Sequence, residues 1–225
     1  MAMGIFKKIF LGIVDLVFRR VILLFILAAI FSTVFINHHS LKLKTLNYLL
    51  PSKEELKVFV EQPDALSRDQ LKSFLVYYKT VCDFVKNDPE ESAPCSMVGY
   101  AYYYLGNEKK AAQYYRRSCQ LNDRFFWFYF NLGVIYYNQE RYAEAADVFA
   151  QALNTPADHA AYFFMLTKTY REISRILDIS PEDYEKSLNK GYELSKQLLM
   201  ISQLMVHQPE MRNRIQREKI DLHLF

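Results

Sequence analysis

The side chains that could carry chemistry are few and scattered along this sequence. Of the five histidines, the adjacent pair His38-His39 comes nearest to a metal site. Adjacent residues point in different directions from a helix, so we interpret this pair as part of a membrane–water interface. The sequence has no glycine-rich phosphate loop, no Cys-x-x-Cys, no His-Glu-x-x-His and no Gly-x-Ser-x-Gly. We therefore predict that the chain is not an enzyme and that it uses no cofactor, no metal ion and no small-molecule substrate.

The composition indicates a helical protein that does not bind nucleic acid. The chain has 225 residues, of which 51% are hydrophobic and 24% are charged, which is enough for one sizeable core and an appendage. Only six glycines and seven prolines occur, which argues against a turn-rich β protein. The formal net charge is +3 and no dense Lys/Arg cluster is present, so a surface that tracks phosphates is not expected.

The strongest signal is a pattern between about residues 92 and 159 that recurs at an interval of 34 residues. Small residues recur where two helices must approach closely, and aromatic residues recur around them to fill the gaps between layers. Short turns are predicted where each first helix hands over to its second, at 105–107 and 138–140. The recurring pairs are Gly99 and Gly133, Tyr102 and Tyr136, Ala111 and Ala145, and Tyr115 and Phe149.

A helix–turn–helix unit of this length and pattern resembles the tetratricopeptide repeat (TPR) family. The resemblance covers two clear repeats, 92–125 and 126–159. The usual Trp slot holds Tyr129 in the second repeat and Cys95 in the first, where the sequence departs from the family.

The flanks of these repeats are predicted to be degenerate versions of the same unit. Pro89 stands where a tetratricopeptide repeat ends, so we expect 52–91 to form a capping repeat. We expect 160–206 to form a third repeat with an insertion, although Thr167 replaces its small residue. Residues 207–225 are interpreted as a tail with a short, solvent-facing helix and a loose or partner-bound end.

The first 36 residues differ in kind from the rest and predict a membrane anchor. Residues 1–20 have the apolar spacing of an amphipathic interfacial helix, and 21–36 are uncharged and almost wholly apolar. Sixteen helical residues span roughly 24 Å of a core about 30 Å thick, and flanking arginines can make up the difference. An uncleaved signal anchor is preferred over a cleaved signal peptide or a buried helical hairpin, and 37–51 is a linker. The predicted fold is thus an all-α solenoid of about three TPR-like repeats behind an amphipathic and a transmembrane helix.

The positive charges around the predicted span indicate its orientation weakly. By the positive-inside rule, the N-terminus is expected on the cytoplasmic side and the repeats on the non-cytoplasmic side, which would be the periplasm in a bacterium. The charges before the span are Lys7, Lys8, Arg19 and Arg20, and those after it are Lys42, Lys44 and Lys53.

The three cysteines leave two alternatives open. Cys95 lies early in one predicted helix and Cys119 late in its antiparallel partner, so outside the cytoplasm these two could form a disulfide. The alternative is that both, together with Cys82, are independent small buried residues.

The TPR resemblance implies that the first helix of each repeat lines a concave groove that binds a peptide or helix of another protein. Of the slots at which chaperone-binding members hold a carboxyl terminus, only Asn131 has the required type, so a two-carboxylate clamp is not expected. Ser96 and Asn138 also fall in groove slots. The predicted partner-binding residues are Tyr100, Tyr103, Tyr104, Trp127, Phe130, Val134, Tyr137, Phe164, Lys168 and Arg171.

A groove of this aromatic character is expected to be covered by something. Either it is filled internally, by the helix predicted at 184–206 or the one at 53–61, or it receives an apolar helix or extended segment of a partner; a small ligand is a third alternative. Internal filling would move partner binding to the convex face or to the basic tail around Arg212, Arg214 and Arg217.

We expect a scaffold or structural subunit that mediates protein–protein contacts within a membrane-associated complex. The alternative is a transient assembly factor or chaperone for exported or membrane proteins. The aromatic content and the amphipathic N-terminal helix favour the permanent subunit.

Overall fold

The computed structural model describes residues 51–84, 92–156, 168–213 and 219–223. The chain divides into two units, 1–48 and 49–225, and only the second contains described residues. The predicted interfacial helix, transmembrane helix and almost all of the linker therefore lie outside the described residues. Within them, no helix combines the length and the apolar character that a membrane crossing needs.

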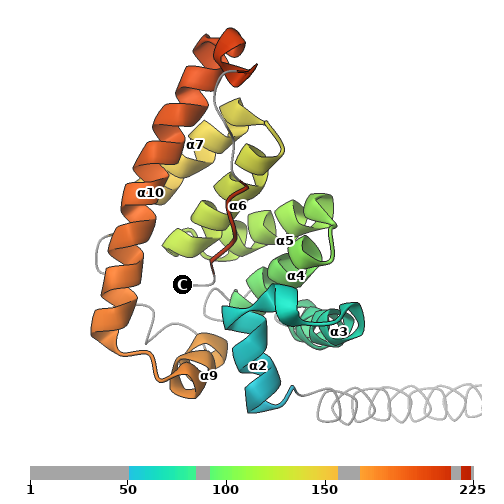
Figure 1. Ribbon diagram of the computed structural model, residues 1–225. Helices are drawn as coiled ribbons and strands as arrows, with labels where there is room; N and C mark the ends of the chain where they lie inside the picture. The colour runs from blue at the N-terminus through green and yellow to red at the C-terminus, as the bar shows by residue number, and fades with distance from the viewer. Residues whose placement is uncertain (1–50, 85–91, 157–167, 214–218, 224–225) are drawn as a thin grey trace, which may run out of the picture. The chain divides into compact units, whose positions relative to one another are not determined.

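The described part of the chain is all-α, and no strand occurs in it. Its elements appear in Figure 1 in the colour order of the sequence. They are α2 (Lys53–Glu61), η1 (Pro63–Ala65), α3 (Arg68–Phe84), α4 (Ala93–Tyr104), α5 (Glu108–Leu121), α6 (Phe126–Asn138), α7 (Tyr142–Leu153), α9 (Lys168–Leu177), α10 (Pro181–His207) and η3 (Pro209–Asn213).

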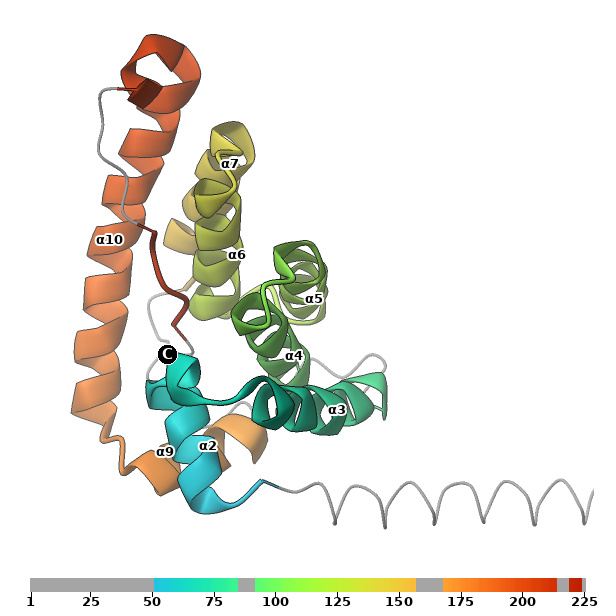
Figure 2. The same ribbon diagram turned by 45° about the vertical axis from the view of Figure 1, so that its right-hand side comes forward.

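Helices α3 to α7 pack in chain order, each against the next (Figures 1 and 2). Both turns within the recurring unit need a residue in the left-handed region. Gly106 takes it with φ 79° and Glu140, 34 positions later, takes it with φ 60°. Glycine adopts this conformation at little cost, so Glu140 carries a strain that Gly106 does not. The predicted solenoid arrangement is confirmed for these helices.

The small residues of the repeat allow each helix pair to close. A methyl group added to Gly99 of α4 would lie 2.8 Å from Cδ2 of Tyr115 on α5, which is closer than real Cβ contacts. Gly133 of α6 and Phe149 of α7 stand in the same relation. The small–large pairing predicted from the sequence therefore holds each hairpin together.

Serine side chains cap the starts of α2 and α10. The hydroxyl of Ser52 accepts a hydrogen bond from the N–H of Glu55, whose carboxylate accepts one from the N–H of Ser52. Ser180 caps α10 by accepting from the N–H of Asp183, and Pro181 occupies the first helical position.

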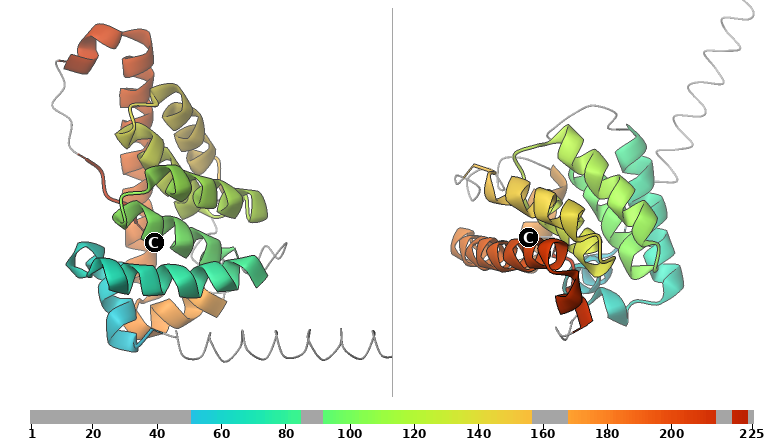
Figure 3. Two further views of the ribbon diagram at one scale, coloured as in Figure 1. Left: turned by 90° about the vertical axis from the view of Figure 1, so that its right-hand side faces the viewer. Right: turned by 90° about the horizontal axis from the view of Figure 1, so that it is seen from above.

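Helices α9 and α10 differ from the expected third repeat. Helix α9 lies against α2 and α4, whereas α10 packs along α7 and touches α6 (Figure 3). The buried face of α10 combines large residues, such as Leu188 and Leu198, with the small residues Gly191 and Ser195. A methyl group on Gly191 would lie 2.7 Å from Cε1 of Phe126 and 2.8 Å from Cη2 of Trp127. At Gly191, helix α10 thus leaves room for the two rings at the start of α6.

The cysteines pair differently from either sequence alternative. Cys82 at the end of α3 and Cys95 at the start of α4 form a disulfide, with their Cα atoms 4.9 Å apart. Cys119 is free and buried. Of the two alternatives, a Cys95–Cys119 bond is wrong, and independent cysteines hold only for Cys119, because the packing of α3 on α4 brings Cys82 to Cys95.

Candidate functional site

The residues predicted to line the groove lie on α4 and α6, and almost all of those described are covered. Trp127 is 2% exposed, Phe130 and Val134 are 0% exposed, and Tyr104 is half-buried. Phe164 lies outside the described residues, and the side chains of Lys168 and Arg171 on α9 are not described. The other buried residues of the set are Tyr100, Tyr103 and Tyr137.

Helix α2 covers the groove at α4. The ring of Phe59 meets that of Tyr100 edge-on, with centroids 5.3 Å apart. The hydroxyl of Tyr100 donates to the carbonyl oxygen of Val60 at 3.3 Å, and burial raises the pKa of this phenol well above its usual value. The predicted internal cover by the 53–61 helix is therefore present at this end.

Helix α10 covers the groove at the start of α6. The ring of Tyr192 lies 4.5 Å, centroid to centroid, from that of Phe126, and the preceding residue, Gly191, lies against Trp127. The other predicted internal cover, by the 184–206 helix, is therefore also present.

The remaining cover is a segment at the end of the tail, which was not among the covers predicted from the sequence. Residues 219–223, here called the 219–223 segment, are extended and run beside α6 (Figures 1 and 2). Two asparagine side chains of α6 hold its backbone. The amide nitrogen of Asn138 donates to the carbonyl oxygen of Ile220 at 2.8 Å, and its amide oxygen accepts from the N–H of Ile220 at 3.1 Å. Asn131 makes the same pair of bonds with His223, whose N–H donates to the amide oxygen at 2.8 Å.

Aromatic side chains complete this contact. The hydroxyl of Tyr103 donates to the carbonyl oxygen of Ile220 at 3.2 Å, and the ring of Tyr103 lies 4.8 Å below the ammonium group of Lys219. The imidazole of His223 lies 5.7 Å from the ring of Phe130 and 6.0 Å from that of Trp127. Burial among these rings lowers the pKa of His223. The arrangement binds an extended main chain in a defined register.

Two family models match the helices that form this site. One described as a TPR repeat matches residues 99–140, and one described as a tetratricopeptide repeat matches residues 126–155. Residues 99–155 are thus tetratricopeptide repeats. The search of curated proteins found no match.

The TPR assignment places Asn131 and Asn138 on the first helix of the second repeat, the helix expected to line the groove. The end of the tail, expected to be loose or bound to a partner, is extended at 219–223, and the amides of α6 bond the backbones of Ile220 and His223. The basic residues named as a second surface are not described, except for the backbone of Arg212 in η3. The signal that could have located the site is the pair of asparagines seven positions apart, which places both on one helix face.

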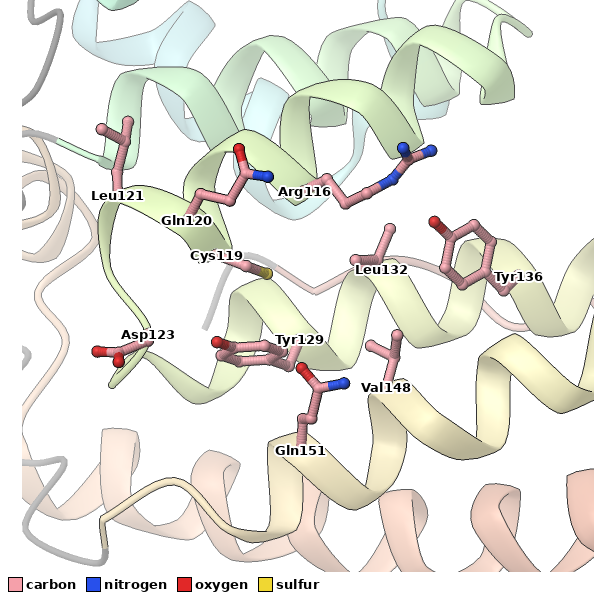
Figure 4. Close-up of a pocket in the computed structure, with 10 residues that line it drawn as sticks. All are labelled: Arg116, Cys119, Gln120, Leu121, Asp123, Tyr129, Leu132, Tyr136, Val148 and Gln151. Atoms are coloured by element: carbon pink, nitrogen blue, oxygen red, sulfur yellow. The ribbon is translucent and has the colours of Figure 1, made fainter.

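A second concave feature of the TPR unit is an open hollow of about 600 Å³ between α5, α6 and α7 (Figure 4). Cys119 points into it near Tyr129, and burial raises the pKa of both groups, that of Tyr129 to about 12. A thiol whose pKa is raised stays protonated and is a poor nucleophile. Among the described residues, no group of three or more His, Cys, Asp or Glu side chains is placed to hold a metal ion.

Proposed function

We propose that this TPR protein is a non-enzymatic, membrane-anchored scaffold and a structural subunit of a membrane-associated protein complex. The observation that carries the proposal is the Asn131–Asn138 pair, which holds an extended polypeptide backbone along α6. Main-chain hydrogen bonds of this kind are a common means of binding a peptide of another protein.

The anchor and its orientation belong to the same proposal. Residues 1–36 would hold the protein in the membrane, with the repeats on the non-cytoplasmic side. The Cys82–Cys95 disulfide supports this orientation, since structural disulfides persist in oxidising compartments and are rare in the cytosol. Protease protection tests it. In intact cells or right-side-out vesicles, the repeats should be cleaved from the non-cytoplasmic side, and protection of the repeats there would contradict this orientation.

Crosslinking of the purified native protein tests the scaffold. A short lysine-reactive crosslinker should join exposed lysines of the first repeat, such as Lys109 and Lys110 of α5, to a second protein in stoichiometric yield. If every crosslink joins two residues of this chain, the scaffold proposal is wrong.

A further inference from the structure

The two asparagines of α6 match the spacing of an extended chain. Asn131 and Asn138 are seven residues apart, which is about 10.5 Å along a helix. Ile220 and His223, the residues they bind, are three apart, which is about 10 Å along an extended chain. Each amide therefore meets one residue of an antiparallel segment without a change of register. The geometry recognises a main chain and does not depend on which protein supplies it.

The side chains of the segment add a simple pattern. Leu222 is buried with 4% exposure and Ile220 is half-buried, whereas Asp221 between them is exposed. Alternate residues of an extended chain point to opposite sides, so one face of the segment is apolar and the other meets solvent. The ammonium group of Lys219 lies 4.0 Å from the Glu108 carboxylate. The site thus fits a segment of four residues in which the first is basic and the second and fourth are apolar.

The 219–223 segment is held by different interactions from those of the other two segments that cover the groove, helices α2 and α10. Helices α2 and α10 cover the groove chiefly with apolar and aromatic contacts. At α6 the floor contains the amide of Asn131, which is 1% exposed. A buried amide is costly unless both its donor and its acceptor are satisfied, so it suits a surface that binds a backbone better than a permanently closed core. The 219–223 segment satisfies it as a peptide ligand would.

We propose that the α6 site is a docking site for an extended segment of a partner protein with the pattern basic–apolar–any–apolar, and that the chain's own 219–223 segment occupies it until the partner displaces it. The inference rests on the proposed function and names how the partner is held. Because the segment is tethered, it competes at a high effective concentration, so the site is closed to weak ligands.

The test uses the full-length protein in mild detergent and a fluorescent peptide with the sequence of residues 217–225 as the probe. In the wild type, the tethered segment should hinder the probe. Two substitutions release the segment without touching the α6 surface: Leu222→Asp, which puts a charge into the buried position, and Ile220→Pro, which removes the N–H that Asn138 accepts. Fluorescence anisotropy should show at least about ten-fold tighter probe binding to both variants than to the wild type.

Substitutions in the site and in the probe establish the mode of binding. In the Leu222→Asp chain, the further substitution Asn138→Leu should lower the affinity for the probe by at least about ten-fold. Asn189→Leu, at an exposed asparagine of α10, should leave it unchanged. A probe methylated on the nitrogen of its Ile220 equivalent should lose affinity to the same extent as the Asn138→Leu variant.

Several outcomes overturn the proposal. Equal probe affinity for the wild type and both release variants would show that the 219–223 segment does not compete with the probe. If neither variant binds the probe while circular dichroism shows intact helices, the proposal is also wrong. Light scattering provides a further check. If the wild type contains two chains and the release variants contain one, the occupant is a second copy of this chain and not a partner. The native complex of the proposed function could persist in each of these cases, so the two failures are distinguishable.

Discussion

Gly133 and Phe149 approach so closely that a methyl group on Gly133 would lie 2.7 Å from Cε1 and 2.8 Å from Cδ1 of the ring. The packing of the repeat requires both residue types. Helix α6 must present a surface without a side chain at Gly133, and the ring of Phe149 on α7 fills the space above it. The same approach recurs between Gly99 and Tyr115 in the first repeat.

Gly133→Ala should therefore destabilise the protein by about 1–3 kcal/mol through overpacking, despite the better helix propensity of alanine. The midpoint of thermal unfolding in mild detergent measures the effect. Phe149→Leu removes the ring atoms that clash, so the double variant should be less destabilised than the sum of the single variants. Strict additivity would mean that the two side chains are not in contact.

The disulfide predicts a definite count of thiols. Denatured protein kept from reductant should expose one reactive thiol, that of Cys119, and three after reduction. Mass spectrometry of a non-reduced digest should find Cys82 joined to Cys95. Replacing both by serine should lower the free energy of unfolding by about 2–4 kcal/mol, while Cys119→Ser leaves the linkage in place. A Cys95–Cys119 peptide would refute the assignment.

Acid should loosen the 219–223 segment. Burial beside Trp127 and Phe130 lowers the pKa of His223 below its ordinary value of 6.5, and the neighbouring Asp221 carboxylate opposes this only in part. The released segment therefore binds a proton more readily than the docked one. Docking should be strongest above pH 6.5 and should weaken as the pH falls through the interval down to the lowered pKa.

The fluorescence of Trp127, the single tryptophan of the chain, reports this change, because its ring lies 6.0 Å from that of His223. A titration from about pH 7 to about pH 5 should shift the emission of the wild type, and His223→Gln should abolish the shift. An identical titration in the variant would show that another group is responsible.

The predicted membrane span makes a separate prediction. Replacing Leu27 and Ala28 by arginine should cost about 2.5–3.5 kcal/mol for each charge at the middle of a membrane helix. The variant should then be extracted from membranes by alkaline carbonate, whereas the wild type and Leu27→Val should stay in the membrane. Complete extraction of the wild type would show that residues 21–36 do not anchor the protein.

The repeats could be predicted because their packing rule is local and recurs. Gly99 and Tyr115 are close in sequence, and their spacing repeats at Gly133 and Phe149, so one interval identifies both hairpins. The groove could be placed on α4 and α6 for the same reason. The start of α10 was also visible, because the cap of Ser180 needs only its neighbours.

The segments that cover the groove are held by contacts between residues far apart in the sequence. Such contacts produce no periodic pattern in the sequence. His223 meets Asn131 across 92 residues, and an extended segment has no pattern that names its partner. Nothing in the sequence around Gly191 indicates its role. Only the structure shows that the rings of Phe126 and Trp127 occupy the space that a side chain at this position would fill. The disulfide was missed for a similar reason, since only the packing of α3 on α4 decides which cysteine reaches Cys95.

The mass of the native particle tests the central claim most directly. The protein should be extracted from its own membrane with mild detergent, and the protein mass of the particle should be measured before and after a high-salt wash. A built-in subunit predicts a salt-resistant assembly much larger than the 26.6 kDa of one chain, with at least one other protein in fixed proportion. A particle of one or two copies of this chain alone would contradict that claim and would favour a transient assembly factor.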